Sequence, residues 1–216
     1  MTSSPTDARR PRRRPGKREA ILDGARTTFA REGYSRASIE TIAAEAEVSS
    51  RTLYNHFGDK ARLFEAVIQV SATEVAEFQL SLIEQFLGDV TDLSVDLDAF
   101  ARAWAGPAPQ HAGHLALVRH IQAEAGHLPP AVLAAWHRAG PGRVQEALAE
   151  RLRSFAERGL LTVDDPEQAA FHLSMLITAE ADNRSYRGAV QLPAEEVAAM
   201  ASAGVRVFLR GYQPTE

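Results

Sequence analysis

The sequence predicts an all-α protein of about nine or ten helices. Along most of the chain, apolar residues recur at three- and four-residue spacing, which is the period of a helix with one buried face. Gly and Pro residues separate most of these stretches. No stretch shows the sustained two-residue alternation with β-branched residues that indicates a half-buried strand. We therefore expect helices packed on helices around one or two cores.

Two short helices joined by a tight turn follow a longer first helix. The first helix is expected to begin at Lys17 and to end near Gly33, because glycine is a common C-terminal cap. Ser38 and Ser49 can each cap the start of a short helix, and the turn between those helices lies near Glu47. This is the helix-turn-helix arrangement, in which the second short helix enters the DNA major groove.

The rest of the chain continues in the same helical pattern. Gly58 ends the third helix, and Asp59 can cap a long fourth helix from about residue 60 to 86. Further helices are expected at about 93–104, 112–125, 130–138, 142–158, 166–186 and 194–210.

Composition and charge narrow the classes of function. The 216 residues are 45% hydrophobic and 24% charged, which is typical of a globular protein. The absence of cysteine excludes disulfides, thiolate metal sites and cysteine nucleophiles. There is no apolar run long enough to span a membrane and no secretory signal, so we expect no membrane partner and a cytoplasmic location.

The net charge of −4 is divided unevenly along the chain. Residues 1–60 hold 12 Lys and Arg against 8 Asp and Glu, whereas residues 61–216 hold 12 against 20. Seven of the basic residues lie within residues 1–18. A basic end on an acidic body suggests that the first part meets a polyanion, although a solvated tail would have the same composition.

The third helix has one apolar and one polar face. Leu53 and Phe57 lie four residues apart and should be buried, and His56 is interpreted as a helix-end residue. The opposite face carries groups that DNA bases and phosphates can bind, namely Ser50, Arg51, Tyr54 and Asn55. Arg pairs bidentately with guanine and Asn with adenine, whereas Ser and Tyr more often contact phosphate. Tyr54 could instead be a half-buried core residue, and Arg51 a solvated charge.

Residues 18–67 resemble the DNA-binding domain of the TetR/AcrR family of transcriptional regulators. The matching patterns are "IL..A...F...GY", "S...IA..A.VS" and "TLY.HF..K..L". The resemblance implies a homodimer with a three-helix DNA-binding domain on each subunit. It implies phosphate contacts for Thr52, Tyr54 and Lys60 and a backbone contact near Ser38. It implies base contacts for Ser50, Arg51 and Asn55.

Two positions depart from the family pattern, because Glu47 and Arg51 stand where the family usually has glycine. A left-handed backbone at Glu47 would cost about 1 kcal/mol. Arg51 adds a cation to the face that reads bases, so we expect it to change the sequence preference. In the polar N-terminal arm, Arg12, Arg13 and Arg14 precede the first helix and could enter the adjacent minor groove.

The resemblance divides the chain into a disordered basic arm (1–16), a helix-turn-helix domain (17–62) and a ligand-sensing and dimerisation domain (63–216). The last part loosely resembles AefR-like C-terminal domains. Candidate walls of an effector pocket are Phe78, Leu82, Phe100, Trp104, Leu117, His120, Ile121 and Trp136. A dimer interface is expected from two stripes of mixed small and large residues, Phe171, Ser174, Met175 and Thr178 on one helix and Val197, Met200, Ala201, Gly204 and Phe208 on the other. Both sets could instead face the core of a single chain.

The expected function is that of a transcriptional repressor, not an enzyme. A homodimer would bind a palindromic operator in double-stranded DNA, and an unidentified small-molecule effector would release it. An activator of the same fold is an alternative. A metal-dependent enzyme is disfavoured because the histidines lack HExxH spacing and no activated nucleophile is evident, so we expect no metal and no cofactor. A helical ligand-binding protein without DNA binding is disfavoured by the set of Arg51, Tyr54 and Lys60.

Overall fold

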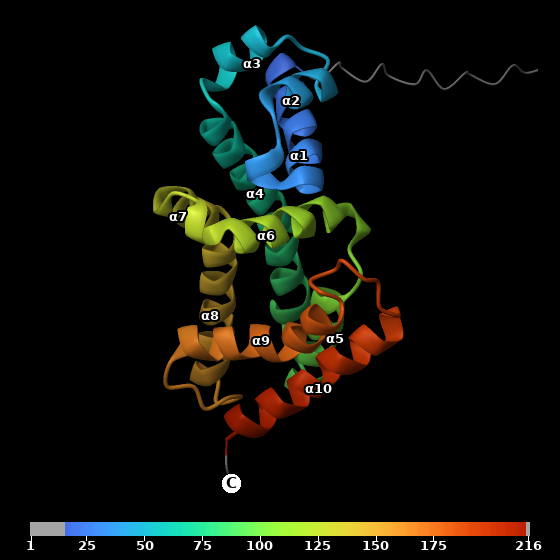
Figure 1. The fold of residues 1–216 in the computed structure, drawn as a ribbon. Helices are drawn as coiled ribbons and strands as arrows, with labels where there is room; N and C mark the ends of the chain where they lie inside the picture. The colour runs from blue at the N-terminus through green and yellow to red at the C-terminus, as the bar shows by residue number, and fades with distance from the viewer. Residues whose placement is uncertain (1–15, 215–216) are drawn as a thin grey trace, which may run out of the picture.

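The computed structural model describes residues 16–214, and every regular element in that range is a helix (Figure 1). This confirms the predicted all-α class, with ten α-helices and two short 3₁₀ turns in the described residues. The first five helices are α1 Lys17–Arg36, α2 Ile39–Glu45, α3 Ser50–Phe57, α4 Lys60–Leu87 and α5 Leu93–Ala105. The other five are α6 Ala112–Glu124, α7 Pro130–Ala139, α8 Pro141–Glu157, α9 Pro166–Arg184 and α10 Ala194–Tyr212. The 3₁₀ turns, Pro109–His111 and Ala125–His127, flank α6.

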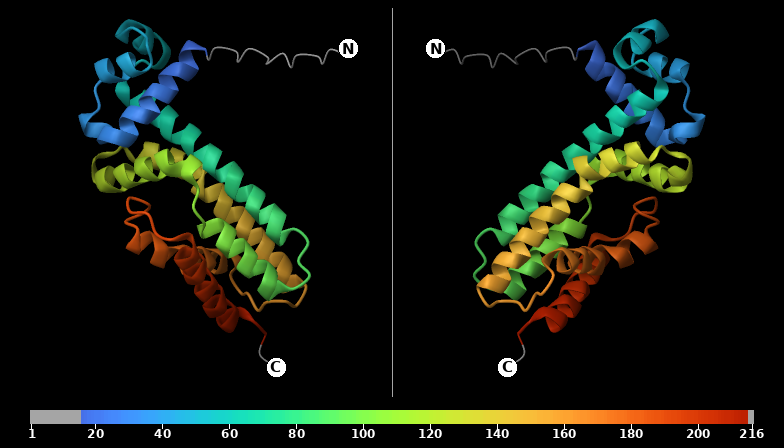
Figure 2. Two further views of the ribbon diagram at one scale, coloured as in Figure 1. Left: turned by 90° about the vertical axis from the view of Figure 1, so that its right-hand side faces the viewer. Right: turned by 90° about the vertical axis from the view of Figure 1, so that its left-hand side faces the viewer.

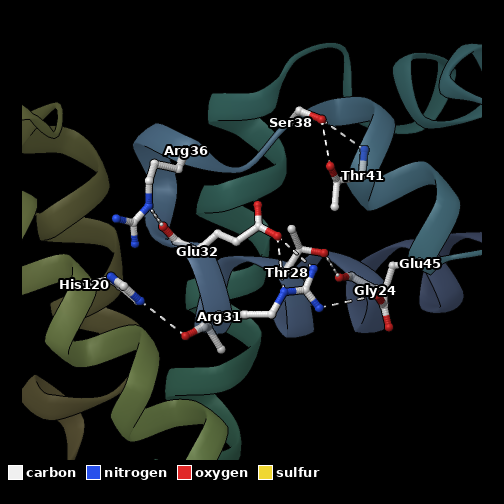
Figure 3. Close-up of polar contacts among 10 residues, drawn as sticks. Gly24, Thr28, Arg31, Glu32, Arg36, Ser38, Thr41, Glu45 and His120 are labelled. Atoms are coloured by element: carbon white, nitrogen blue, oxygen red, sulfur yellow. Dashed lines mark hydrogen bonds and ion pairs between the residues drawn. The ribbon is translucent and has the colours of Figure 1, made fainter.

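The predicted N-terminal caps are confirmed at three helices. The Ser38 hydroxyl accepts a hydrogen bond from the Thr41 N–H over 3.0 Å at the start of α2 (Figure 3). The Ser49 hydroxyl accepts from the Thr52 N–H over 3.1 Å at the start of α3. Asp59 accepts from the backbone N–H of Arg62 over 2.8 Å at the start of α4. Each cap satisfies one of the backbone donors that a helix leaves unpaired in its first turn.

Positive φ angles occur near the end of α1 and in the turn between α2 and α3. Gly33 has φ 79° and interrupts α1 near its end, where the sequence predicted a helix stop. Glu47 has φ 52° in the turn between α2 and α3. A side chain in this conformation costs on the order of 1 kcal/mol, so the tight turn forms despite the missing glycine.

The described residues form two hydrophobic cores, and α4 contributes side chains to both. Figure 2 shows α4 as a long helix that runs from the N-terminal helices into the body. The first core joins α1, α2 and α3 to the first turns of α4, which contribute Leu63 and Phe64. The second core lies lower in Figure 1, among α4, α5, α8, α9 and α10. The expected domain boundary at residue 62 falls in the first turn of α4, upstream of residues that belong to the first core. The division into domains remains a prediction.

Helix α6 belongs to the first core although it follows α5 in the chain. It lies across α1 and beneath α2 and α3 in Figure 1, and Leu117 and Ile121 from its apolar face are buried in the first core. The body therefore meets the N-terminal helices at two places, through the continuous rod of α4 and through the side of α6. Within residues 16–214, no helix is long and apolar enough to cross a membrane.

Candidate nucleic-acid interface

Helix α3 presents the two faces that the sequence predicted. Leu53 is fully buried and Phe57 nearly so, and both pack in the first core. On the other side, Arg51 and Asn55 are exposed, and the Tyr54 side chain is 49% exposed. Ser50 is half-buried in the first turn of the same helix. The polar groups of α3 thus form one surface on a helix of eight residues, a shape that a DNA major groove admits.

Arg51 differs from the other arginines of the N-terminal helices. Among the described arginines up to residue 62, it alone makes no hydrogen bond, ion pair or aromatic contact with another described residue. Arg18 lies over the Phe57 ring, Arg26 and Arg31 pair with acidic side chains, Arg36 donates to the Glu32 carbonyl, and Arg62 pairs with Asp59. Its five donors are therefore available to an external acceptor.

The hydroxyls of Ser38 and Thr52 are already part of helix caps. The Ser38 hydroxyl lies 3.0 Å from that of Thr41, and the Thr52 hydroxyl lies 2.9 Å from that of Ser49. A hydroxyl has one donor and two acceptor positions, so each can form a cap and still reach a phosphate oxygen. Both residues lie at helix starts, where backbone N–H groups favour an anion.

Lys60 is held at the start of α4 by the last residues of α1, which follow the kink at Gly33. Its ammonium donates to the Ser35 carbonyl over 3.4 Å and lies 4.7 Å from the centre of the Tyr34 ring. Tyr34 in turn packs against Phe64 at a ring distance of 4.9 Å. Sequence reasoning did not identify Tyr34 and Ser35 as supports of Lys60. The "GY" in the family pattern was the only signal for them.

Two predicted DNA-contact groups need separate mention. The arm residues Arg12, Arg13 and Arg14 lie outside the described residues, so their role remains a prediction. His56 lies exposed in the last turn of α3, as expected of a helix-end residue.

The residues predicted for the effector pocket lie in two different cores, and the position of the pocket remains a prediction. The second core contains the candidates on α4 and α5, namely Phe78, Leu82, Phe100 and Trp104. The first core contains the candidates on α6 and α7, namely Leu117, Ile121 and Trp136. The His120 side chain contacts α1, where its Nε2 lies 3.2 Å from the Ala30 carbonyl oxygen (Figure 3). The physical reason is the course of α6, whose apolar side packs on α1 rather than on the helices of the body.

Two open pockets lie elsewhere on the described residues. One of about 510 Å³ opens between α4 and α8 and is lined by Leu80, Ile83, Glu84, Ala147, Glu150, Arg151 and Ser154. Another of about 340 Å³ opens beside α9 and α10 and is lined by His172, Met175, Leu176, Val207, Phe208, Gly211 and Tyr212. Neither is lined by a residue predicted for the effector pocket. Trp136 has a buried indole N–H without a hydrogen-bond partner among the described residues.

The residues predicted for the dimer face are buried on α10 and partly exposed on α9, and the interface itself remains a prediction. All five predicted residues of α10 are buried within one chain, so they expose little apolar surface: Val197, Met200, Ala201, Gly204 and Phe208. The reason is a close crossing of α9 and α10, where Gly204 lies against the Leu176 carbonyl. On α9, Phe171 and Met175 are 55% and 43% exposed, while Ser174 and Thr178 are half-buried and bond to carbonyls of their own helix. The exposed apolar residue on α10 is Val207, which the sequence did not single out.

His111 and His114, near the start of α6, each contact a residue of α4. Nδ1 of His114 lies 3.0 Å from the hydroxyl of Ser71, which is buried, and the His111 ring contacts that of Phe78 at 4.9 Å. Burial, followed by the neighbouring His111, lowers the pKa of His114 to about 4. Within residues 16–214, no three His, Asp or Glu side chains gather in a way that could hold a metal ion.

Comparison with known proteins matches both parts of the chain. Residues 21–67 match the family described as bacterial regulatory proteins of the tetR family, and residues 97–214 match the AefR-like transcriptional repressor C-terminal domain. The chain is 35% identical over 77 residues to the HTH-type transcriptional repressor AcnR of Corynebacterium efficiens, which covers 35% of this chain and 41% of that protein. That match therefore spans less than half of the relative's length.

Two longer matches cover nearly the whole chain. The HTH-type transcriptional regulator UidR of Escherichia coli K12 is 26% identical over 202 residues, covering 90% of this chain and 91% of that protein. The crystal structure of a TetR-family transcriptional regulator from Mesorhizobium loti superposes with a TM-score of 0.80 at 29% identity. It covers 92% of this chain and 97% of that one.

Proposed function

The chain belongs to the TetR family of transcriptional regulators, and on that premise we propose that it is a repressor that binds a palindromic operator as a homodimer. The observation that carries the proposal is the polar surface of α3, on which Arg51 has no partner among the described residues. Ser50, Arg51 and Asn55 read bases in this proposal, and Thr52, Tyr54, Ser38 and Lys60 bind phosphates.

Dimerisation would use the exposed apolar surface of α9 and α10. Met175 and Val207 line the 340 Å³ groove, and Phe171 lies one helical turn before Met175 on α9. All three are exposed apolar side chains on helices that otherwise face the core. A two-fold contact places the same patch of both chains together, so a projecting Phe171 can enter the partner's groove. Phe171→Arg should therefore give monomers in analytical ultracentrifugation. Arg206→Ala, at an exposed position of α10 that does not line the groove, should leave the dimer intact.

Release from DNA by a small-molecule effector completes the proposal. Such a ligand must bind more tightly to a form whose two α3 helices no longer match successive major grooves. We propose that the effector binds among the helices of the body beyond α4. The protein would act in the cytoplasm, where the operator lies. Activation instead of repression would appear as increased transcription from a reporter that carries the operator.

The experiment is a binding measurement with duplexes from the protein's own upstream region. Fluorescence anisotropy at several salt concentrations should detect saturable, salt-sensitive binding to a symmetric site. Lys60→Ala and Tyr54→Phe should weaken binding to all sequences alike, because a phosphate contact carries no base information. Equal affinity for the symmetric site and for a scrambled duplex of the same length would contradict the proposal.

A further inference from the structure

We infer that Glu124 is a positioning residue, which fixes the angle between the helix-turn-helix and the body and thereby sets the half-site spacing that the dimer accepts. The inference rests on the proposed function, because it concerns how two DNA-binding units are held at one separation. Its basis is a cluster of polar contacts between the end of α6 and the turn at residues 33–36.

The Glu124 carboxylate accepts three hydrogen bonds from this turn. The backbone N–H groups of Tyr34 and Ser35 donate to it over 3.2 and 3.1 Å, and the Ser35 hydroxyl donates to the same carboxylate. Two successive backbone donors directed at one carboxylate form an anion-binding concavity. Hydrogen bonds to a charged acceptor are stronger than neutral ones, so this small contact holds the turn firmly.

Gly33 is the backbone position that allows this contact. It is buried with φ 79°, and a Cβ at this position would lie 2.8 Å from Glu124 Oε1 and 2.9 Å from His120 Nδ1. Any side chain would therefore displace the Glu124 and His120 side chains from their present positions, and it would also be strained at this positive φ. His120 adds a second contact one helical turn earlier, through its Nε2 and the Ala30 carbonyl at 3.2 Å.

The same turn supports a proposed phosphate contact. Ser35 is bound to Glu124 through its N–H and hydroxyl, and its carbonyl accepts from the Lys60 ammonium over 3.4 Å. One residue thus lies between the end of α6 and the cation at the start of α4. The end of α6 is therefore connected to the start of α4 through hydrogen bonds to the same residue.

The consequence for DNA binding follows from the two connections between the parts. Helix α4 is continuous with the body but, as a single rod, it can bend and rotate about its axis. The contact of α6 with the turn supplies the second point that fixes the orientation of α3 relative to the body. Without it, each chain should still bind one half-site, but the pair of chains should tolerate a wider range of half-site separations.

The test compares wild type with Glu124→Gln, which removes the charge and one acceptor at nearly constant shape. Glu74→Gln is the matched control, because Glu74 also accepts from α1, at Arg26 over 3.0 Å, but in an exposed ion pair. Affinities are measured for the symmetric operator, for versions with one or two base pairs added to or removed from its centre, and for a single half-site. For Glu124→Gln we expect the loss of affinity on changing the spacing to be at least threefold smaller than for wild type. Half-site affinity should be unchanged, and the control should behave as wild type.

A second measurement does not depend on DNA. In the free full-length protein, amide hydrogen exchange at Tyr34 and Ser35 should become faster in Glu124→Gln, on the order of tenfold. The amides of α2 and α3 should exchange as before, which shows that the helix-turn-helix still folds. Unchanged spacing tolerance in the variant overturns the positioning role even if wild type binds its operator. Absence of specific binding by wild type instead overturns the proposed function, and the positioning role with it.

Discussion

The backbone N–H of Ser35 donates to the Glu124 carboxylate over 3.1 Å, although the two residues are 89 positions apart in the chain. This bond joins the last turn of α6 to the turn at residues 33–36, at the end of α1. Since α6 also buries Leu117 and Ile121 beside α1, the junction has both an apolar and a polar component. The body can therefore influence the DNA-binding helices through a side contact as well as through α4.

Arg51 should determine one base pair of the operator. Arg51→Ala is expected to lower affinity for the preferred sequence by about 1 to 3 kcal/mol and to remove discrimination at one position, because a bidentate contact to guanine is lost. Selection of bound duplexes from a randomised pool would show this as one position that becomes degenerate. Arg102→Ala, on α5, serves as the control and should leave the selected sequence unchanged. Loss of affinity that is equal for all duplexes would assign Arg51 to a phosphate instead.

The crossing of α9 and α10 should not tolerate a methyl group at Gly204. A Cβ there would lie 2.1 Å from the Leu176 carbonyl oxygen, so Gly204→Ala must push the helices apart. We expect a loss of roughly 1 to 3 kcal/mol in the free energy of unfolding. At Gly211 on the same helix a Cβ meets nothing within 4 Å, so Gly211→Ala should be neutral or stabilising. Urea unfolding of both variants separates the two cases, and equal stability of both would refute the close crossing.

The left-handed residue at the turn between α2 and α3 provides a test of backbone strain. Glu47→Gly should leave stability unchanged or raise it by up to about 1 kcal/mol, since glycine adopts φ 52° without strain but loses more chain entropy on folding. Ala44→Gly, in the neighbouring helix, should instead lower stability by about 1 kcal/mol. Thermal unfolding of the pair is the measurement. A glycine at position 47 that destabilises as much as one at 44 would contradict the strained turn.

Local features of this fold could be predicted from the sequence because they depend on neighbours only. Ser38, Ser49 and Asp59 accept the capping bonds expected of them, since a cap needs only a side-chain oxygen two or three residues before a free N–H. The division of α3 into a buried and an exposed face likewise follows from helical spacing. The sequence showed that Arg51 stands where the family usually has glycine. It could not show that the Arg51 side chain has no partner among the described residues.

Features that depend on which helices meet could not be predicted in the same way. The stripe of Val197 and Phe208 was interpreted as a dimer face, but apolar periodicity is the same whether a helix packs on its own chain or on another. The candidate pocket residues on α6 fall within the expected ligand-sensing part, residues 63–216, whereas the helix packs on α1. Glu124 carries no local signal, because its acceptor role exists only after the chain returns to Ser35.

The junction of α4 and α6 should make stability depend on pH through His114. Burial lowers the pKa of His114 to about 4, so the folded protein keeps this ring neutral where the unfolded chain, with a pKa near 6.5, takes up a proton. The unfolded state therefore binds more protons between these values, and the free energy of unfolding falls as the pH decreases from about 6.5 to about 4, by up to roughly 3 kcal/mol. His114→Asn keeps a polar group near the Ser71 hydroxyl but cannot titrate, so its stability should fall less over this range.

Other groups also titrate in acid, so the informative quantity is the difference between proteins. Urea unfolding at pH 7 and at pH 4.5 should show a smaller acid loss in His114→Asn than in wild type, by about 2 to 3 kcal/mol. His127→Gln is the control, because that histidine is exposed and makes no side-chain hydrogen bond with another described residue. It should retain the wild-type dependence on pH. The loss of stability between pH 7 and pH 4.5 could instead be equal in His114→Asn and in the control. That result would mean that the His114 ring takes up a proton as readily in the folded state as in the unfolded chain, contrary to its burial beside Ser71.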